Sequence, residues 1–305
     1  MAIVKLYLLG HPVSQSLSPR MQNAALQHLG LTARYEALDT SPDALETTLE
    51  QLEADPSVLG CNVTVPHKVA VYAWLLRKGR LVRSRSEIAQ AVNTLFRGAD
   101  GLFHGDSTDF DGAMGAIQLE AFGGDESRFL EALPELDVAI LGAGGSGRSI
   151  ATNLVRPWRG AKPRSVTVFA RDPRKAQEVA AAAVWQKLSA TSAPLADFAA
   201  WNRDRASLVI QTTTLGMSSG PGPTESPVPP DSLHPGQIAF DLVYKPHETP
   251  FLVQAAAQGA TIVHGIGMLV GQGALSLGRW CTSLDEPRSV SHPDLVARMT
   301  RALQD

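Results

Sequence analysis

Short β-branched apolar runs alternate along the chain with longer stretches that have the spacing of amphipathic helices. The apolar runs predict β-strands at residues 3–9, 58–65, 138–141, 165–169, 208–211, 238–242 and 261–263. Helices are predicted between them at residues 19–29, 66–76, 148–155, 173–185 and 250–258. Strands that alternate with helices of this length indicate βαβ units, so the sequence predicts an α/β fold with mostly parallel sheets.

The pattern changes near Gly112 and again near Gly265, which divides the chain into two predicted domains. Residues 1–112 and 266–305 form an N-terminal α/β domain with a mostly parallel sheet. Residues 113–265 form a doubly wound, Rossmann-type dinucleotide-binding domain. A length of 305 residues is typical of two domains. The Pro-, Gly- and Ser-rich segment 218–235 predicts a surface loop that could move over a ligand.

The composition of the chain argues against several classes of binding partner. The chain has 27 Lys+Arg against 30 Asp+Glu, and the cations are scattered, which argues against binding to nucleic acid or to a membrane surface. Two cysteines, Cys61 and Cys281, are too few for a metal cluster or a disulfide framework and fit a reducing compartment. No signal peptide or membrane-spanning run is visible. We therefore expect a cytoplasmic protein.

A glycine-rich run, Gly142-Ala143-Gly144-Gly145-Ser146-Gly147, directly follows the predicted strand at 138–141. Glycines at its first and third positions let the backbone turn tightly and approach a pyrophosphate, which the N-terminus of the next helix then binds. The run also matches a nucleoside-triphosphate loop, except that Arg148 stands where that loop requires Lys. The dinucleotide interpretation is therefore favoured.

The residues after the strand at 165–169 bear on the choice of cofactor. Ala170 offers no carboxylate for the ribose hydroxyls of NAD, whereas Arg171 and Lys175 supply positive charge for the 2′-phosphate of NADP. Asp172 would repel that phosphate unless it caps the helix that begins at Pro173. The alternative is that these charges form a solvated helix start. The sequence favours NADP and leaves NAD open.

Two motifs place polar groups at predicted helix starts. Ser18 fits the N-cap of the helix at 19–29, and Ser16 on the same side of the turn would complete a site for a small carboxylate. Lys68 lies in the first turn of the helix that Pro66 begins, where the helix dipole disfavours a cation by roughly 0.3–1 kcal/mol. Catalysis would explain this position, and a solvated lysine is the alternative.

Three further segments contain residues that could take part in catalysis or ligand binding. Residues 105–112 hold three acids, but Ser107 and Gln118 occupy the positions where a calcium loop needs carboxylates. Asp109 instead lies where the chain passes between the predicted domains, a place for a cleft residue. Residues 241–246 form a strand end and loop, where ligands gather in parallel sheets. Residues 265–274 form a helix in which Gln272 needs a partner if it is buried.

Taken together, these segments resemble the shikimate dehydrogenase family from about residue 10 to residue 280. The resemblance is carried by residues 16–19, 62–68, 91–95, 107–109, the glycine run, 241–246 and 265–274. It implies an NADP-dependent oxidoreductase of the cytoplasm that acts on a CH–OH group. Its reaction would be the reversible reduction of 3-dehydroshikimate to shikimate in aromatic amino acid (chorismate) biosynthesis. The first domain would bind the substrate and the second NADP.

The resemblance also implies roles for matching residues. Lys68 and Asp109 match the catalytic pair. The residues implied in substrate binding are Ser16, Ser18, Thr64, Asn93, Tyr244 and Gln272. Those implied in cofactor binding are Gly142, Ala143, Gly144, Gly145, Ser146, Ala170, Arg171, Lys175, Leu242 and Gly265. No metal is expected, because hydride transfer of this type needs none. The expected assembly is a monomer or a homodimer.

The chain departs from the family pattern at several positions. Gln22-Asn23 stands for the usual His-Asn, Gln90 for Gly, and Ser107 for Asn. Residues 170–172 read Ala-Arg-Asp where the family usually has Asn-Arg-Thr, which leaves the use of NAD open.

Two alternatives remain. The first is a quinate or quinate/shikimate dehydrogenase using NAD or NADP. Serine at both Ser16 and Ser18 favours shikimate, because a bulkier residue there is associated with quinate. The second is a non-catalytic dinucleotide-sensing regulator, which would need neither Lys68 nor Asp109.

Overall fold

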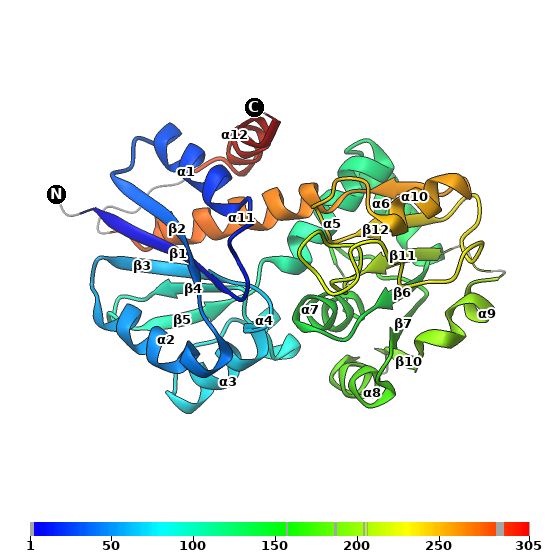
Figure 1. Cartoon of the computed structure of the whole chain (residues 1–305), viewed down its shortest axis with the longest axis horizontal. Helices are drawn as coiled ribbons and strands as arrows, with labels where there is room; N and C mark the ends of the chain where they lie inside the picture. The colour runs from blue at the N-terminus through cyan, green and yellow to red at the C-terminus, as the bar shows by residue number, and fades with distance from the viewer. Residues whose placement is uncertain are drawn as a thin grey trace. The chain divides into compact units, whose positions relative to one another are not determined.

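The computed structural model describes residues 3–156, 158–185, 188–203, 205, 207–284 and 290–304. The chain divides into two compact units: unit 1 is Met1–Gly112 with Leu269–Asp305, and unit 2 is Ala113–Met268. Each unit has a central sheet flanked by helices (Figure 1), so the predicted α/β class is confirmed. None of the helices in the described ranges has the length and apolar character that a membrane crossing requires.

Unit 1 contains a five-stranded sheet in the order β2-β1-β3-β4-β5. Strands β1 (Val4–Gly10), β2 (Ala33–Asp39) and β3 (Val58–Val63) are parallel, whereas β4 (Thr94–Arg97) is antiparallel to both β3 and β5 (Phe103–Asp106). The carboxyl ends of β1, β3 and β5 therefore lie at the same edge of the sheet as the amino end of β4. This edge carries the candidate site of unit 1.

Helices cover both faces of this sheet (Figure 1). The helices of unit 1 are α1 (Ser18–His28), α2 (Leu45–Ala54), α3 (Lys68–Arg77), α4 (Ser84–Ala89) and α12 (His292–Gln304), with a 3-10 turn at Pro42–Ala44. Two longer helices, α5 (Asp109–Phe122) and α11 (Gly265–Thr282), each contain a boundary between the units. The chain thus leaves unit 1 through α5 and returns to it through α11.

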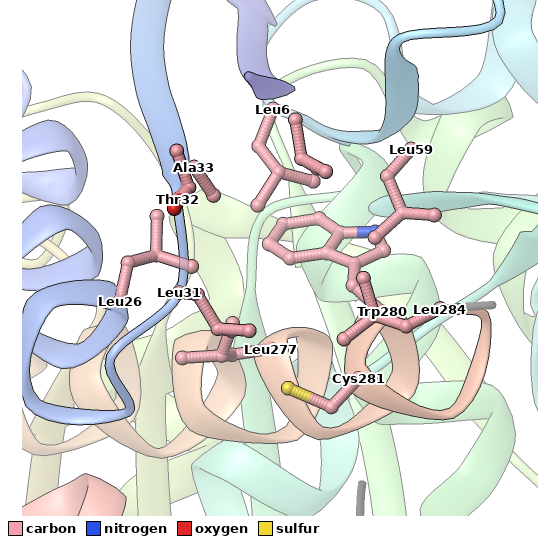
Figure 2. Close-up of a pocket in the computed structure, with 11 residues that line it drawn as sticks. Leu6, Leu26, Leu31, Thr32, Ala33, Leu59, Leu277, Trp280, Cys281 and Leu284 are labelled. Carbon is pink, nitrogen blue, oxygen red and sulfur yellow. The ribbon is translucent and has the colours of Figure 1, made fainter. Parts of the chain in front are cut away.

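Apolar side chains fill both faces of the unit-1 sheet. On one face, Leu6 belongs to a buried cluster with Met21 of α1 and Trp280 of α11. On the other face, Leu9 packs in a cluster that includes Trp74 of α3. A small pocket beside Trp280 (Figure 2) is lined almost wholly by apolar side chains, namely Val4, Leu6, Leu26, Leu31, Ala33, Leu59, Leu277, Cys281 and Leu284, with Thr32. It is part of the core packing.

Unit 2 contains a six-stranded parallel sheet in the order β10-β7-β6-β11-β12-β13. Its strands are β6 (Asp137–Leu141), β7 (Ser165–Ala170), β10 (Thr191–Pro194), β11 (Ser207–Gln211), β12 (Ile238–Asp241) and β13 (Thr261–Val263). The chain moves outward from β6 to β10 and then returns to β11 beside β6. This order is that of a doubly wound sheet, the architecture that the sequence predicts for this unit, and it puts the switch point between β6 and β11, where such sheets bind ligands.

The central strands of unit 2 are buried on both faces, which explains their continuous apolar runs. The helices of this unit are α6 (Glu126–Ala132), α7 (Gly145–Leu154), α8 (Pro173–Ala182), α9 (Phe198–Asn202) and α10 (Pro250–Ala257), with 3-10 turns at Leu133–Glu135 and Leu195–Asp197. Segment 218–235 contains neither helix nor strand, as expected, and Val228 and Leu233 anchor it in the core.

The prediction that Ser18 is the N-cap of α1 is wrong. Leu17 occupies the N-cap position with no side-chain hydrogen bond, and Ser18 is the first helical residue. The backbone N–H of Ser18 donates to Ser16 Oγ at 3.2 Å. Ser16 therefore partners one of the N–H groups that a helix start exposes, which is the role expected of Ser18.

Several other boundaries also differ from the prediction. Helix α3 begins at Lys68 rather than Pro66, and β3 ends at Val63, because residues 64–67 form a turn closed by a 2.9 Å bond from the His67 N–H to the Thr64 carbonyl. Helix α8 ends at Ala182 rather than 185, since β8 (Val184–Trp185) pairs with β9 (Leu188–Ser189).

Candidate functional site

Three polar residues converge at the carboxyl edge of the unit-1 sheet. Lys68 begins α3 just after β3, Asn93 immediately precedes β4, and Asp109 begins α5 just after β5. All three are buried, with at most 8% of any of these residues exposed. The sheet order brings these positions together although they are far apart in the sequence.

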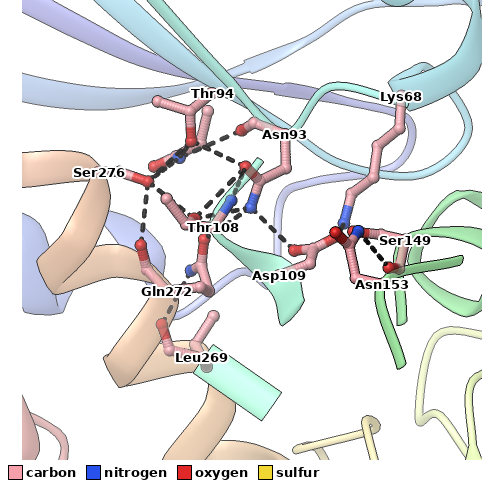
Figure 3. A network of polar contacts seen from close by, with 11 residues as sticks. Lys68, Asn93, Thr94, Thr108, Asp109, Ser149, Asn153, Leu269, Gln272 and Ser276 are labelled. Atoms are coloured by element: carbon pink, nitrogen blue, oxygen red, sulfur yellow. Dashed lines mark hydrogen bonds and ion pairs between the residues drawn. The ribbon is translucent and has the colours of Figure 1, made fainter. Parts of the chain in front are cut away.

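Lys68 and Asp109 form a buried ion pair (Figure 3). Lys68 Nζ lies 2.6 Å from Asp109 Oδ2, and the side chains are only 10% and 4% exposed. The dipole of α5 favours a carboxylate at Asp109, whereas the dipole of α3 disfavours an ammonium group at Lys68. A buried amine held this way by a carboxylate is suited to exchange a proton with a bound hydroxyl group.

Asn93 fixes the orientation of the Asp109 carboxylate. Its Nδ2 donates to Asp109 Oδ1 at 2.8 Å and to Thr108 Oγ1 at 2.9 Å. Its Oδ1 accepts from the Thr108 N–H at 2.9 Å and from Thr94 Oγ1 at 2.8 Å. One carboxylate oxygen therefore contacts Lys68 and the other contacts Asn93 (Figure 3).

The part of α11 that belongs to unit 1 supplies two further residues of this network, Gln272 and Ser276. Gln272 Oε1 accepts from Asn93 Nδ2 at 3.3 Å, so Gln272 has the partner that the sequence requires of it. Ser276 Oγ lies 2.8 Å from Thr94 Oγ1 and accepts from Asn62 Nδ2 at 2.9 Å. The polar groups thus support one another from β3, β4 and α11.

Three other predicted substrate residues lie at the same sheet edge. Ser16 and Ser18 follow β1, and Thr64 follows β3, where its backbone N–H donates to the Leu9 carbonyl at 2.8 Å. Ser18 is buried, while Ser16 and Thr64 are half-buried. In the described ranges, neither serine is hydrogen-bonded into the network around Asn93.

The glycine run connects β6 to α7 in unit 2. Gly142 has φ +119°, and a Cβ there would lie 2.6 Å from Thr212 Oγ1; a Cβ at Gly147 would lie 2.4 Å from the Gly142 carbonyl oxygen. A Cβ at Gly144 would meet no protein atom within 4 Å, and no side chain caps α7. The fold therefore requires Gly142 and Gly147, whereas Gly144 borders open space at a helix N-terminus that fits a pyrophosphate.

Cationic side chains lie just after the neighbouring strand β7. Ala170 ends the strand, and both Arg171 and Lys175 are exposed. Asp172 caps α8, with Oδ1 accepting from the Arg174 N–H at 3.0 Å. The capping role expected of Asp172 is confirmed, and its carboxylate is engaged at the helix start.

The loop after β12 is held by a buried acid. Asp241 Oδ1 accepts from the Val243 N–H at 2.9 Å, and Oδ2 accepts from Thr249 Oγ1 at 2.6 Å. Burial raises the pKa of Asp241 to about 7. Two predicted cofactor residues approach each other here, since a Cβ on Gly265 would lie 2.6 Å from the Leu242 carbonyl oxygen.

The remaining predicted substrate residue, Tyr244, lies in the same loop and is half-buried. It belongs to unit 2, whereas the other five predicted substrate residues belong to unit 1.

Sequence reasoning missed several residues of both groups. Thr94, Thr108 and Ser276 support Asn93 in unit 1. In unit 2, Thr212 lies at the switch point, where its N–H donates to the Leu141 carbonyl at 2.8 Å. The sequence does place Thr212 directly after a predicted strand. It does not show the order of the strands in the sheet, which is what places Thr212 at the switch point.

Comparison with known proteins gives a consistent result. The model of the shikimate dehydrogenase substrate binding domain matches residues 8–95, within unit 1. The shikimate dehydrogenase (NADP(+)) of Salinibacter ruber is 38% identical over 277 residues, which cover 90% of each chain.

Two solved structures match over nearly their whole length. Shikimate 5-dehydrogenase of Thermus thermophilus, in complex with NADP(H) and shikimate, has a TM-score of 0.76 at 31% identity, covering 98% of this chain and 100% of that one. Quinate dehydrogenase of Corynebacterium glutamicum, in complex with NAD, has a TM-score of 0.78 at 25% identity, covering 99% and 98%.

Proposed function

The chain belongs to the shikimate dehydrogenase family, and from that premise we propose that it is an NADP-dependent shikimate dehydrogenase. Its reaction is the reversible reduction of 3-dehydroshikimate to shikimate, the oxidation or reduction of one CH–OH group in aromatic amino acid (chorismate) biosynthesis. The single observation that carries the proposal is the buried Lys68–Asp109 pair, with Nζ 2.6 Å from Oδ2. A regulator that only senses a dinucleotide has no use for such a pair.

In this proposal the two units divide the ligands. Unit 1 binds the substrate, with Ser16 and Ser18 at its carboxylate and Thr64, Asn93 and Gln272 at its ring hydroxyls and carboxylate. Tyr244 of unit 2 belongs to the same substrate set. Unit 2 otherwise binds the cofactor.

In this proposal, the buried Lys68–Asp109 pair carries out the proton transfer. Lys68 Nζ takes the proton from the substrate hydroxyl during oxidation and returns it during reduction. Asp109 hydrogen-bonds the same hydroxyl and holds the amine in place. Asn93 in turn orients the carboxylate through its 2.8 Å bond to Oδ1. Because all three are buried, these groups are held in one arrangement before the substrate binds.

The residues of unit 2 fit a bound NADP, which supplies or accepts the hydride. The open space beside Gly144 and the uncapped start of α7 would hold the pyrophosphate through residues 142–146. Exposed Arg171 and Lys175, after Ala170, would hold the 2′-phosphate. Leu242 and Gly265 would line the nicotinamide pocket.

The second candidate is a quinate/shikimate dehydrogenase, supported by the similarity to a quinate dehydrogenase in complex with NAD. Ser16 and Ser18 favour shikimate, and the exposed Arg171 and Lys175 favour NADP over NAD.

Steady-state rates with shikimate or quinate, each with NADP+ or NAD+, test the proposal. We expect kcat/KM to be highest for shikimate with NADP+. Preference for quinate or for NAD+ would support the second candidate. Cofactor binding without oxidation of either acid would support the regulator.

The proposal extends to the location and assembly of the protein. A cytoplasmic location agrees with two cysteines, Cys61 and Cys281, that are buried thiols. The proposed assembly is a monomer or a homodimer, which sedimentation of the purified chain distinguishes.

A further inference from the structure

Two histidines and a glutamate meet in unit 2, in the same segments that carry Leu242, Tyr244 and Gly265. His247 and Glu248 lie in the loop between β12 and α10, and His264 lies between β13 and α11. One ligand atom from each residue lies within 4.8 Å of the other two. Ligand atoms from two separate segments of the chain therefore lie close together.

A fourth residue, Glu120, orients the ring of His264. Glu120 Oε2 on α5 lies 2.8 Å from His264 Nδ1 and also accepts from the His264 backbone N–H at 3.0 Å. In the neutral imidazole with its hydrogen on Nδ1, Nδ1–H donates to this carboxylate and Nε2 carries the lone pair that a metal ion would take. A carboxylate that orients a histidine in this way is the usual outer partner of a metal-binding histidine.

His264 Nε2 lies 3.2 Å from Glu248 Oε1. His247 Nδ1 approaches the same oxygen, also at 3.2 Å. When both of these nitrogens are unprotonated, all three atoms are acceptors, and a cation can then bridge them. The two imidazole rings stack with their centroids 4.1 Å apart.

The spacing suits a tetrahedral ion. Zinc bonded to nitrogen and oxygen at its usual lengths holds neighbouring ligand atoms about 3.3 Å apart. Two of the three pairs in the cluster already have separations of 3.2 Å. The third pair is within 4.8 Å, and the His247 side chain is 60% exposed, so it has room to rotate toward the ion.

We propose that His247, Glu248 and His264 form a binding site for one divalent transition-metal ion of the zinc class, with Glu120 as the outer partner of His264. Water completes the fourth position, as in other sites with three protein ligands. Such an ion would clip the loop after β12 to the start of α11 and α5. This inference does not depend on the proposed function.

Calorimetric titration of the full chain with Zn²⁺ tests the site. We expect one ion per chain, bound at least ~10-fold more weakly by His247→Ala and by His264→Gln. Glu120→Gln should weaken binding by about 10-fold or more without changing the stoichiometry, since it touches His264 and not the ion. His28→Ala, an exposed histidine at the end of α1, is the matched control and should bind as the parent chain does.

Thermal unfolding gives a second readout that does not depend on activity. Zn²⁺ at about 100 times its Kd for the parent chain should raise the Tm of the parent chain by about 4 °C and that of His247→Ala by no more than about half as much. Equal Zn²⁺ affinity in the parent chain, His247→Ala and His264→Gln would overturn the proposal. So would the lack of any saturable binding to the folded parent chain.

Discussion

The electrostatics of the substrate unit depend on where single residues sit on their helices. Lys68 and Asp109 each begin a helix, so the two dipoles act in opposite senses on the ammonium and the carboxylate. The sequence indicated a functional role for Lys68, because the helix dipole disfavours a cation in the first turn of a helix. Asn93 gave no comparable local signal, and its role follows from contacts with residues 15 and 16 positions away.

Removal of the amine tests the proposed base. Lys68→Met keeps the length of the side chain but takes no proton, so we expect kcat for shikimate oxidation to fall by about 10²–10⁴-fold. The matched control is Lys78→Met, at the other end of α3, where Lys78 pairs with Glu50 at the surface. This control should retain activity. Undiminished kcat in a folded Lys68→Met variant would show that another group moves the proton.

Asp241 should make the stability of the protein depend on pH. Its pKa in the folded chain is raised to about 7, so the folded state holds a proton that the unfolded state releases above its ordinary pKa of 3.8. The contribution to stability is therefore full below about pH 4 and is lost as pH rises through 7, by up to roughly 4 kcal/mol. Asp241→Asn removes this titration and keeps an acceptor for the Val243 N–H.

Urea unfolding midpoints at several pH values measure this effect. We expect the parent chain to lose stability relative to Asp241→Asn between pH 4 and 7. A difference between the two proteins that stays constant over this range would mean that Asp241 has the same pKa in both states.

At the scale of elements, the sequence predicts the continuous apolar strands of unit 2 well and misses several other strands, most of them at sheet edges. Each strand predicted within β6, β7, β11 and β12 lies within one residue of its observed limits, because burial on both faces leaves a continuous apolar run. The outer strands β2, β5 and β10 were missed, and so was the inner strand β4. The exposed positions of β2 and β10 carry polar residues, as in Ala33–Asp39, so no such run marks them.

Two glycines of the glycine run are expected to have different roles, Gly142 in folding and Gly144 in binding of NADP. Gly142→Ala places a Cβ at φ +119° and against Thr212, so we expect loss of stability by about 1–3 kcal/mol together with weaker NADP+ binding. Gly144→Ala has an ordinary φ of −79° and no protein atom within 4 Å of the new Cβ. It should change stability by less than about 0.5 kcal/mol yet raise the Kd for NADP+.

Thermal unfolding and calorimetric titration with NADP+ distinguish these two glycine variants. If Gly144→Ala bound NADP+ as tightly as the parent chain, the pyrophosphate would have to lie elsewhere.

For the whole molecule, the proposed ligand sets divide between two units with separate cores. Lys68, Asn93 and Asp109 depend on the unit-1 sheet, and the glycine run depends on the unit-2 sheet. The sequence predicted the doubly wound unit because its strands and helices alternate regularly. It could not supply the order of the strands, so the supporting contacts of Ser276 and Thr212 emerge only from the three-dimensional fold.

This separation predicts independent binding of the two ligands. Lys68→Met should bind NADP+ alone with the Kd of the parent chain, and Gly144→Ala should bind shikimate alone with its parental Kd. Titration of each variant with one ligand at a time measures both. Weaker binding of the opposite ligand in either variant would show that the two sets are coupled in the absence of the second ligand.

The return of the chain through α11 has a consequence for biogenesis. Trp280 packs against Gly60, and its Nε1 donates to the Leu95 carbonyl at 2.8 Å, so a residue made late completes the core of the first unit. During translation, every strand of unit 2 leaves the ribosome before Trp280 does. Unit 2 can therefore finish its sheet while the nascent N-terminal segment still waits for its last helices, which reverses the usual order in which the first-made domain folds first.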